Sequence, residues 1–339
     1  MKAARNTVSA AASCPAWFLA TSLALGLTMA PAYAQGPMPG DAGNDGIKVT
    51  MLGTGTPDTR VDRLGPSTLI EVGGYDFLID AGRGTGTRLG QLGMPLGEID
   101  GIFLTHFHSD HTIGVPDIFL TGFIPLPLGG RQTALPIYGP EHVQDLAEGL
   151  MHAYHEDIKL RKGTMIPAES LKLEAHPIKE GVVFDRDGVK ITAFLVSHDP
   201  KSEADYGYKV EYGGHKVVFS GDTTYDPAVA EAGAGADLIV HEVAVVARGM
   251  EDEPFFKNVV MPIHTSPEDA GRIFAQAQPK LAVFNHIALL PGNGPMKPDE
   301  QEILQRAGEN YDGRMVVGED LMTITITEEG VTVGSALDR

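Results

Sequence analysis

A dense cluster of potential metal ligands constrains this chain more than any other feature. Three histidines and one aspartate fall within the six residues from His106 to His111. They directly follow residues 101–104, an apolar segment typical of a buried strand. Imidazole and carboxylate groups bind zinc and similar divalent ions. A lone histidine is usually structural, but a strand that ends in this cluster indicates a metal site at a sheet edge.

Four more ionisable residues each follow a predicted strand, where a sheet would hold the side chain rigidly. They are Asp80, His198, Asp222 and His286. Any one of them alone is explained equally well as a cap or turn residue. Together with the histidine cluster, they indicate one metal site assembled from distant parts of the chain.

The N-terminal region has the pattern of a secretory signal peptide, predicted to span residues 1–34. Lys2 and Arg5 precede an apolar stretch at residues 16–30, and a small-x-small cleavage site lies at 32–34. The stretch is too short to cross a bilayer comfortably, so an uncleaved anchor is only the alternative. The predicted location is therefore periplasmic or secreted, with no membrane attachment after cleavage. Cleavage also removes Cys14, the one cysteine, and leaves no thiolate ligand.

Residues 35–45, rich in Gly, Pro and Asp, are predicted to be a flexible leader. Residues 46–339 are long enough for one large α/β domain or two small ones, and a single domain is our first choice. The chain is β-rich first, then helical, then β-rich and helical again, which predicts two packed sheets with helices outside. Helices are predicted over residues 140–162 and 267–276, the second capped by Ser266. Strands are predicted at 47–52, 68–72, 75–79, 101–104, 189–196, 208–212, 216–219, 237–240, 281–284, 315–318 and 321–327.

The charge balance is strongly acidic. The formal net charge is −19 at pH 7, and loss of Lys2 and Arg5 with the signal peptide makes it more negative. Such a surface repels polyanions, and the sequence shows no basic footprint. We therefore expect no nucleic-acid partner.

These motifs, in this order, resemble the metallo-β-lactamase superfamily over nearly all of the mature chain. The resemblance implies an αββα sandwich with a dinuclear site at one edge of the sheets, holding two divalent ions. Zinc is the first choice, with manganese or iron as alternatives. It further implies three roles: His106, His108 and His198 hold the first metal; Asp110, His111 and His286 hold the second; and Asp222 bridges both. The matching stretches are residues 53–56, 78–82, 106–111 and 221–223 with His198 and His286.

Within the superfamily, the chain looks most like the ribonuclease Z and arylsulfatase-like branch. The stretches that carry this likeness include Gly207-Tyr208, His241-Glu242 and His264-Thr265-Ser266. The likeness implies that Glu242 orients His264 as a proton donor, so these two residues are expected to be catalytic together with Asp110. A buried structural His–Glu pair is the alternative. Asp80 resembles the family's carboxylate that orients a ligand histidine.

The substrate expectation rests on what the chain lacks. In ribonuclease Z, tRNA processing uses a long arm inserted between the third ligand motif and the bridging aspartate. Here His198 and Asp222 are only 24 residues apart, which leaves no room for that arm. Together with secretion and acidity, this favours a small anionic ester, with an arylsulfatase-like hydrolase using metal-activated water as the first choice.

Four alternatives remain open from the sequence. The first is a phosphodiesterase, either ribonuclease Z-like or acting on a cyclic nucleotide, because sulfate monoesters and phosphodiesters carry the same single charge. A lactonase and a β-lactamase-like hydrolase are further enzyme alternatives. The last is a non-catalytic protein in which the metals only stabilise the fold. The apolar residues 119–128 are predicted to form either a lid over the substrate or a packing loop, and a homodimer is one option for the assembly.

Overall fold

Two β-sheets organise the chain in the computed structural model, which describes residues 46–291 and 298–337. The predicted signal peptide and leader lie outside the described residues. The first sheet has the strand order β15-β14-β1-β2-β3-β4-β5-β6, and the second β13-β12-β11-β10-β9-β8-β7. The first-sheet strands are β1 (Ile47–Gly53), β2 (Ser67–Val72), β3 (Tyr75–Ile79), β4 (Gly101–Phe103), β5 (Leu135–Gly139), β6 (Leu173–Pro177), β14 (Met322–Thr327) and β15 (Gly330–Ser335). The second-sheet strands are β7 (Gly181–Arg186), β8 (Val189–Val196), β9 (Asp205–Tyr212), β10 (His215–Phe219), β11 (Leu238–Val246), β12 (Leu281–Leu290) and β13 (Met315–Val317).

The main core lies between the two sheets. Side chains at alternating positions of β1 and β2, such as Val49 and Ile70, pack with Tyr208, Val217 and Val240 of the second sheet. All five are buried, and β-branched and aromatic residues of this kind suit a pleated, close-packed surface. The apolar character of the predicted strands is therefore explained by face-to-face packing of the sheets.

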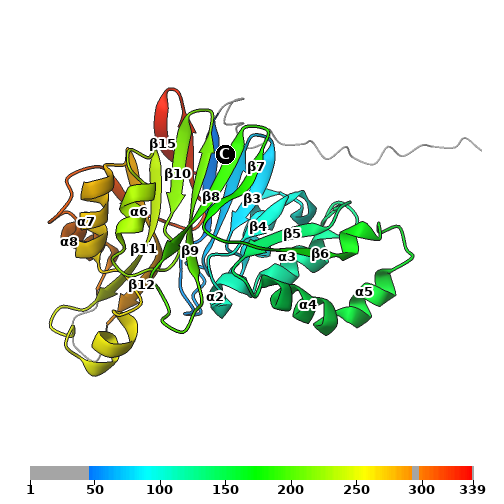
Figure 1. Ribbon diagram of the computed structural model, residues 1–339, viewed down its shortest axis with the longest axis horizontal. Helices are drawn as coiled ribbons and strands as arrows, with labels where there is room; N and C mark the ends of the chain where they lie inside the picture. The colour runs from blue at the N-terminus through cyan, green and yellow to red at the C-terminus, as the bar shows by residue number, and fades with distance from the viewer. Residues whose placement is uncertain (1–45, 292–297, 338–339) are drawn as a thin grey trace, which may run out of the picture. The chain divides into compact units, whose positions relative to one another are not determined.

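Helices cover the outer face of each sheet (Figure 1). Leu89, Phe119 and Val143, on α1, α3 and α4, belong to the core against the first sheet. Val229 and Phe274, on α6 and α7, belong to the core against the second. The arrangement is the predicted αββα sandwich in a single domain. The helices are α1 (Thr85–Leu92), α2 (Ser109–Thr112), α3 (Val115–Gly122), α4 (Val143–Ala153), α5 (His155–Arg161), α6 (Pro227–Ala232), α7 (Pro267–Ala277) and α8 (Glu300–Ala307), with short 3-10 turns η1 (Leu96–Glu98) and η2 (Glu169–Leu171) and a π-helix η3 (Phe256–Val260).

Three details refine the predicted elements. Ser266 accepts a hydrogen bond from the Asp269 amide at 3.1 Å, so the predicted N-cap of α7 is confirmed. The predicted 140–162 helix is two helices, α4 and α5, interrupted at Tyr154. The apolar segment 119–128 divides in two: residues 119–122 end α3, with Phe119 and Phe123 buried in the core, whereas residues 125–128 are exposed. No helix among the described residues is long and apolar enough to span a membrane.

Candidate metal centre

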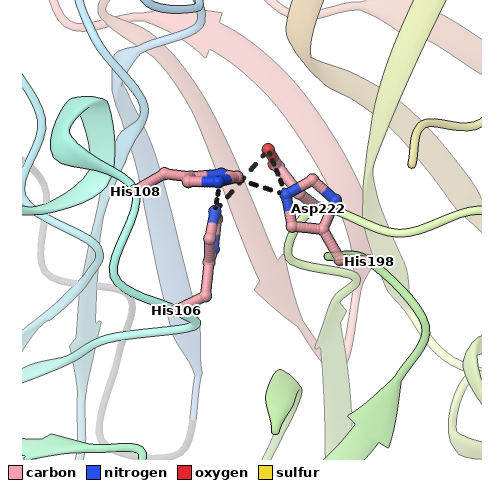
Figure 2. Close-up of side chains that lie close together, drawn as sticks. All are labelled: His106, His108, His198 and Asp222. Carbon is pink, nitrogen blue, oxygen red and sulfur yellow. Dashed lines mark hydrogen bonds and ion pairs between the residues drawn. The ribbon is translucent and has the colours of Figure 1, made fainter. Parts of the chain in front are cut away.

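Three histidines predicted as ligands of one ion converge at the edge of the sandwich (Figure 2). His108 Nδ1 lies 3.0 Å from His106 Nε2 and 3.1 Å from His198 Nε2. A neutral imidazole has one nitrogen lone pair, and nitrogens this close share at most one proton between each pair. The cluster therefore has the donor set that a divalent cation binds.

A second set of ligands lies beside the first, and Asp222 stands between the two. Asp110, His111 and His286 form this set, with His286 Nε2 3.2 Å from Asp110 Oδ2. Asp222 Oδ2 is 3.3 Å from His286 Nε2 and 3.4 Å from His111 Nε2. On the other side it is 3.8 Å from His198 Nε2 and 3.9 Å from His106 Nε2. One carboxylate oxygen thus faces both sets, as a bridging ligand must.

The backbone near β4 and β10 brings these groups to one place. The chain leaves β4 at Phe103 and enters the short helix α2, which buries Asp110 and His111 under the site. Gly221 precedes Asp222 with φ of 62°, and a Cβ there would lie 2.6 Å from the Tyr206 carbonyl oxygen. Only glycine fits this position without strain, so the turn that aims Asp222 is determined locally by residue type.

His286 is positioned differently from the prediction. The sequence pattern places it just after a strand ending at residue 284, but β12 continues to Leu290 and β11 to Val246. Asn285 pairs with Glu242 and Ile287 pairs with Val243, so His286 is an extra residue in a β-bulge, with φ of 42°. A bulge redirects a side chain without ending the strand. Apolar patterning cannot distinguish this from a strand end.

The outer nitrogens of three ligands are held by neighbouring oxygens. His111 Nδ1 is 2.8 Å from Asp80 Oδ2, as predicted for Asp80. His198 Nδ1 donates to the Ile263 carbonyl at 2.6 Å. His106 Nδ1 is 2.9 Å from the Thr105 hydroxyl. Each contact leaves Nε2 directed at the metal cluster and fixes the ring orientation.

Thr105 is a site residue that the sequence analysis missed. Its amide and hydroxyl both donate to the Asp80 carboxylate, at 2.9 Å, while the hydroxyl also contacts His106. The only signal was its place next to His106, because a buried threonine has no distinctive sequence pattern. Thr105 thus links the Asp80–His111 pair to His106 in one hydrogen-bond network.

The predicted catalytic pair is present. His264 Nδ1 lies 3.3 Å from both carboxylate oxygens of Glu242, and Glu242 is buried. Glu242 also accepts hydrogen bonds from the Thr265 and Thr223 amides, at 2.9 and 3.2 Å. His264 can also form a ligand group with Asp222 and His286, so it lies directly at the metal cluster. The pair is thus rigidly held within reach of a bound substrate.

Burial and charge shift the pKa values of the ligand candidates, and they do so in opposite directions at different histidines. Burial, followed by the charge on His111, keeps the pKa of His106 well below its ordinary value, and burial also lowers the pKa of His198. Burial would raise the pKa of Asp222, but His286 and His111 outweigh it and hold the pKa well below its usual range. Burial is likewise outweighed at His111, where Asp222 and Asp80 raise the pKa well above normal. Binding of a cation at His111 must therefore release a proton.

The seven ligand candidates fit two divalent ions. His111 Nε2 is buried without a hydrogen-bond partner among the described residues, yet it faces the carboxylates of Asp110 and Asp222 at 3.6 and 3.4 Å. A cation between these atoms would complete their coordination. All seven predicted ligands are brought together, and none is placed elsewhere. The donor set contains only nitrogen and oxygen, which suits zinc, manganese or iron.

Comparisons with known proteins agree with this geometry. Residues 75–287 match the family described as "Beta-lactamase superfamily domain". The chain is 31% identical to ribonuclease Z of Mycobacterium marinum, over 83% of this chain and 99% of the relative. It is 30% identical to ribonuclease Z of Mycobacterium bovis, over 83% and 98%.

Solved structures agree in fold. The metallo-β-lactamase fold protein YhfI from Bacillus subtilis has a TM-score of 0.62 at 20% identity, over 86% of this chain and all of that chain. The short form of human tRNase Z has a TM-score of 0.60 at 21% identity, over 82% of this chain and 98% of that chain.

The relatives correct one expectation. The prediction of a small anionic ester with no nucleic-acid partner is wrong, because these full-length relatives are ribonucleases by name. The error came from the net charge, which describes the whole surface, whereas a site that binds cations has its own local potential. The short interval between His198 and Asp222 argues only against the inserted arm that ribonuclease Z uses for tRNA. It does not by itself exclude RNA as a substrate.

Proposed function

Because the chain belongs to the metallo-β-lactamase superfamily, in its ribonuclease Z branch, and is a metal-dependent hydrolase of ester bonds, we propose that it cleaves phosphodiester bonds in RNA with two zinc ions. One observation carries the proposal: Asp222 Oδ2 lies 3.3–3.9 Å from imidazole nitrogens of both ligand sets. The relatives favour a phosphodiester over the sulfate ester of our first expectation.

In this proposal His106, His108 and His198 would hold one ion, Asp110, His111 and His286 would hold the other, and Asp222 would serve as a ligand of both. When bound, the two ions lower the pKa of water and accept the negative charge that develops on phosphate oxygens. Asp80 keeps His111 oriented through its contact at 2.8 Å. The protein thus supplies a preorganised anionic and imidazole frame that needs little rearrangement.

His264 is the proposed proton donor to the leaving oxygen. The Glu242 carboxylate lies at its Nδ1 and keeps it protonated, so Nε2 carries a proton that can be transferred. A ribose hydroxyl is a poor leaving group as an alkoxide, so this transfer is needed when the bond to phosphorus breaks. The proton moves from His264 Nε2 to that oxygen, and Glu242 stabilises the imidazole through the cycle.

The test compares three substrates with the purified chain. A labelled RNA oligonucleotide and bis(4-nitrophenyl) phosphate are the phosphodiester arms, and 4-nitrophenyl sulfate is the sulfate arm. The proposal is supported if both phosphodiesters are cleaved with a kcat/KM at least tenfold above that for 4-nitrophenyl sulfate. Asp222→Asn and a chelator should each abolish this cleavage. Asp185→Asn, an exposed aspartate on β7, is the matched control and should retain full activity. A reversed preference would return the chain to the sulfatases.

Export is a further part of the proposal. Its support is the charged, apolar and small-residue pattern of residues 1–34, which lie outside the described residues. Mass spectrometry of the protein from cell fractions should find a mature N-terminus at Gln35 in the periplasm or medium. An intact Met1 terminus in the cytoplasm would contradict it.

A further inference from the structure

His108 differs from the other two histidines of its ligand set in how its outer nitrogen is held. Its Nδ1 faces His106 and His198 at 3.0 and 3.1 Å, so its Nε2 must carry the proton when Nδ1 binds a metal. The outer nitrogens of His106 and His198 are held by a buried hydroxyl and a backbone carbonyl. The His108 side chain is 43% exposed, and its Nε2 faces Asp199 Oδ2 at 3.5 Å.

Asp199 is held firmly even though it is partly exposed. Its other carboxylate oxygen, Oδ1, accepts a hydrogen bond from the Lys201 amide at 2.9 Å, and its carbonyl accepts one from the Ser202 amide at 2.9 Å. Its own amide donates to Asp205 Oδ2 at 3.1 Å, and Asp205 is buried at the start of β9. These bonds settle the loop between β8 and β9 and leave Oδ2 free to face His108.

We propose that Asp199 is a positioning residue for the first metal ion, which it serves by orienting His108 and holding the ring in the form with Nδ1 available. The inference rests on the proposed metal site and deepens it. A carboxylate behind a ligand imidazole also makes that imidazole a stronger donor. A cation bound at Nδ1 would polarise the Nε2–H group toward the Asp199 carboxylate, whose Oδ2 lies 3.5 Å from Nε2.

The position of Asp199 gives the inference its specificity. Among the described residues, Asp199 makes no hydrogen bond or ion pair with Asp110, His111 or His286, so its effect should be confined to one of the two ions. Because the side chain is about one-third exposed, water can partly replace it. We therefore expect an effect at the lower end of the roughly 10–100-fold range known for such outer contacts.

The experiment measures zinc binding by competition with a chromophoric chelator, using the whole chain. Asp199→Ala should raise one of the two zinc dissociation constants about tenfold and leave the other unchanged. Asp199→Asn, whose amide oxygen still accepts the imidazole N–H, should recover part of that loss. Glu203→Gln, an exposed residue of the same loop that faces His142, should bind zinc like the wild type. The unfolding midpoint of the metal-free protein should be similar in all three variants.

Two outcomes would overturn the inference. If Asp199→Ala binds two zinc ions with wild-type constants, Asp199 does not position His108, although the metal site itself stands. If zinc affinity falls only together with the metal-free unfolding midpoint, Asp199 stabilises the loop alone, and Asp199→Asn would then fail to recover binding. Failure of the wild type to bind any zinc would instead overturn the proposed function, so the two failures are distinguishable.

Discussion

His264 Nδ1 lies 3.3 Å from the Glu242 carboxylate, although 22 residues separate the two in sequence. The contact is made because β11 carries Glu242, while His264 precedes α7, whose N-cap is Ser266. Glu242 is also held by two backbone amides, so its orientation does not depend on His264. A substitution at His264 therefore tests proton donation with little disturbance of its partner.

We expect His264→Ala to lower kcat about 10²–10⁴-fold while two metal ions remain bound, because it removes only the proton donor. Steady-state kinetics on the labelled RNA oligonucleotide, whose alkoxide leaving group needs the proton, and metal analysis of the same preparation check this. His142→Ala, an exposed histidine, serves as the control. Loss of one metal ion from His264→Ala would show that His264 is a ligand instead, as its group with Asp222 and His286 also permits.

The pH dependence follows from the same pair. Burial by itself lowers the pKa of His264, but the charge and hydrogen bond of Glu242 outweigh it and raise the pKa to about 9. The proton donor is therefore present at neutral pH and is lost as the pH rises through that value. Bound cations oppose protonation, so the alkaline limb of kcat should lie at or below pH 9. Glu242→Gln should move this limb to lower pH, and an unmoved limb would assign it to another group.

The same shift has a consequence for stability. Because the folded pKa of His264 exceeds its unfolded value, its contribution is fully present below pH 6.5 and declines as the pH rises toward 9. Denaturant unfolding of the metal-free protein at pH 6 and pH 9.5 should show a smaller pH effect in Glu242→Gln than in the wild type. Equal pH effects would mean that the pair does not carry this linkage.

Asp80→Asn is expected to weaken metal binding about 10–100-fold, because Asp80 holds His111 at 2.8 Å and cannot be replaced by water in its buried position. Chelator competition measures the effect. Asp100→Asn, an exposed aspartate that accepts a hydrogen bond from the Asp76 amide, provides a control outside the site. Wild-type affinity in Asp80→Asn would limit Asp80 to a structural role with Thr105.

Gly221→Ala should destabilise the fold by about 2 kcal/mol or more, because the new Cβ combines a left-handed backbone with a clash against Tyr206. Gly74→Ala separates the two effects, since Gly74 has φ of 83° but open space around its Cβ position. It should lose only about 1–2 kcal/mol. Urea unfolding of the metal-free variants gives both values, and equal losses would remove the clash from the explanation.

Metal removal should lower the thermal midpoint without unfolding the protein at room temperature. The ions bind only the folded ligand set, and free metal at 100 times its dissociation constant adds about 2.7 kcal/mol. Calorimetry with and without a chelator measures this difference. Asp222→Asn should show little response to the chelator, whereas a full response would mean that Asp222 does not contact the ions.

The metal ligands were predictable because each residue type carries its own chemistry. Three histidines and an aspartate between His106 and His111 indicate a metal site whatever the surrounding fold. Apolar runs and turn residues likewise predicted most strands, and Ser266 predicted the N-cap of α7. These are local properties, which a linear sequence states directly.

The remaining features depend on contacts between distant segments. Only the tertiary structure shows that His286 lies in a bulge of β12, that Thr105 joins Asp80 to His106, and that Asp199 faces His108. A bulge changes strand register by one residue without changing the apolar pattern, and a hydrogen bond depends on angles and distances that residue order does not encode. The sequence by itself determined which groups can bind metal; packing of the two sheets decided how each is aimed, because only packing places side chains from β4, β8, β10 and β12 within a few ångströms of one another.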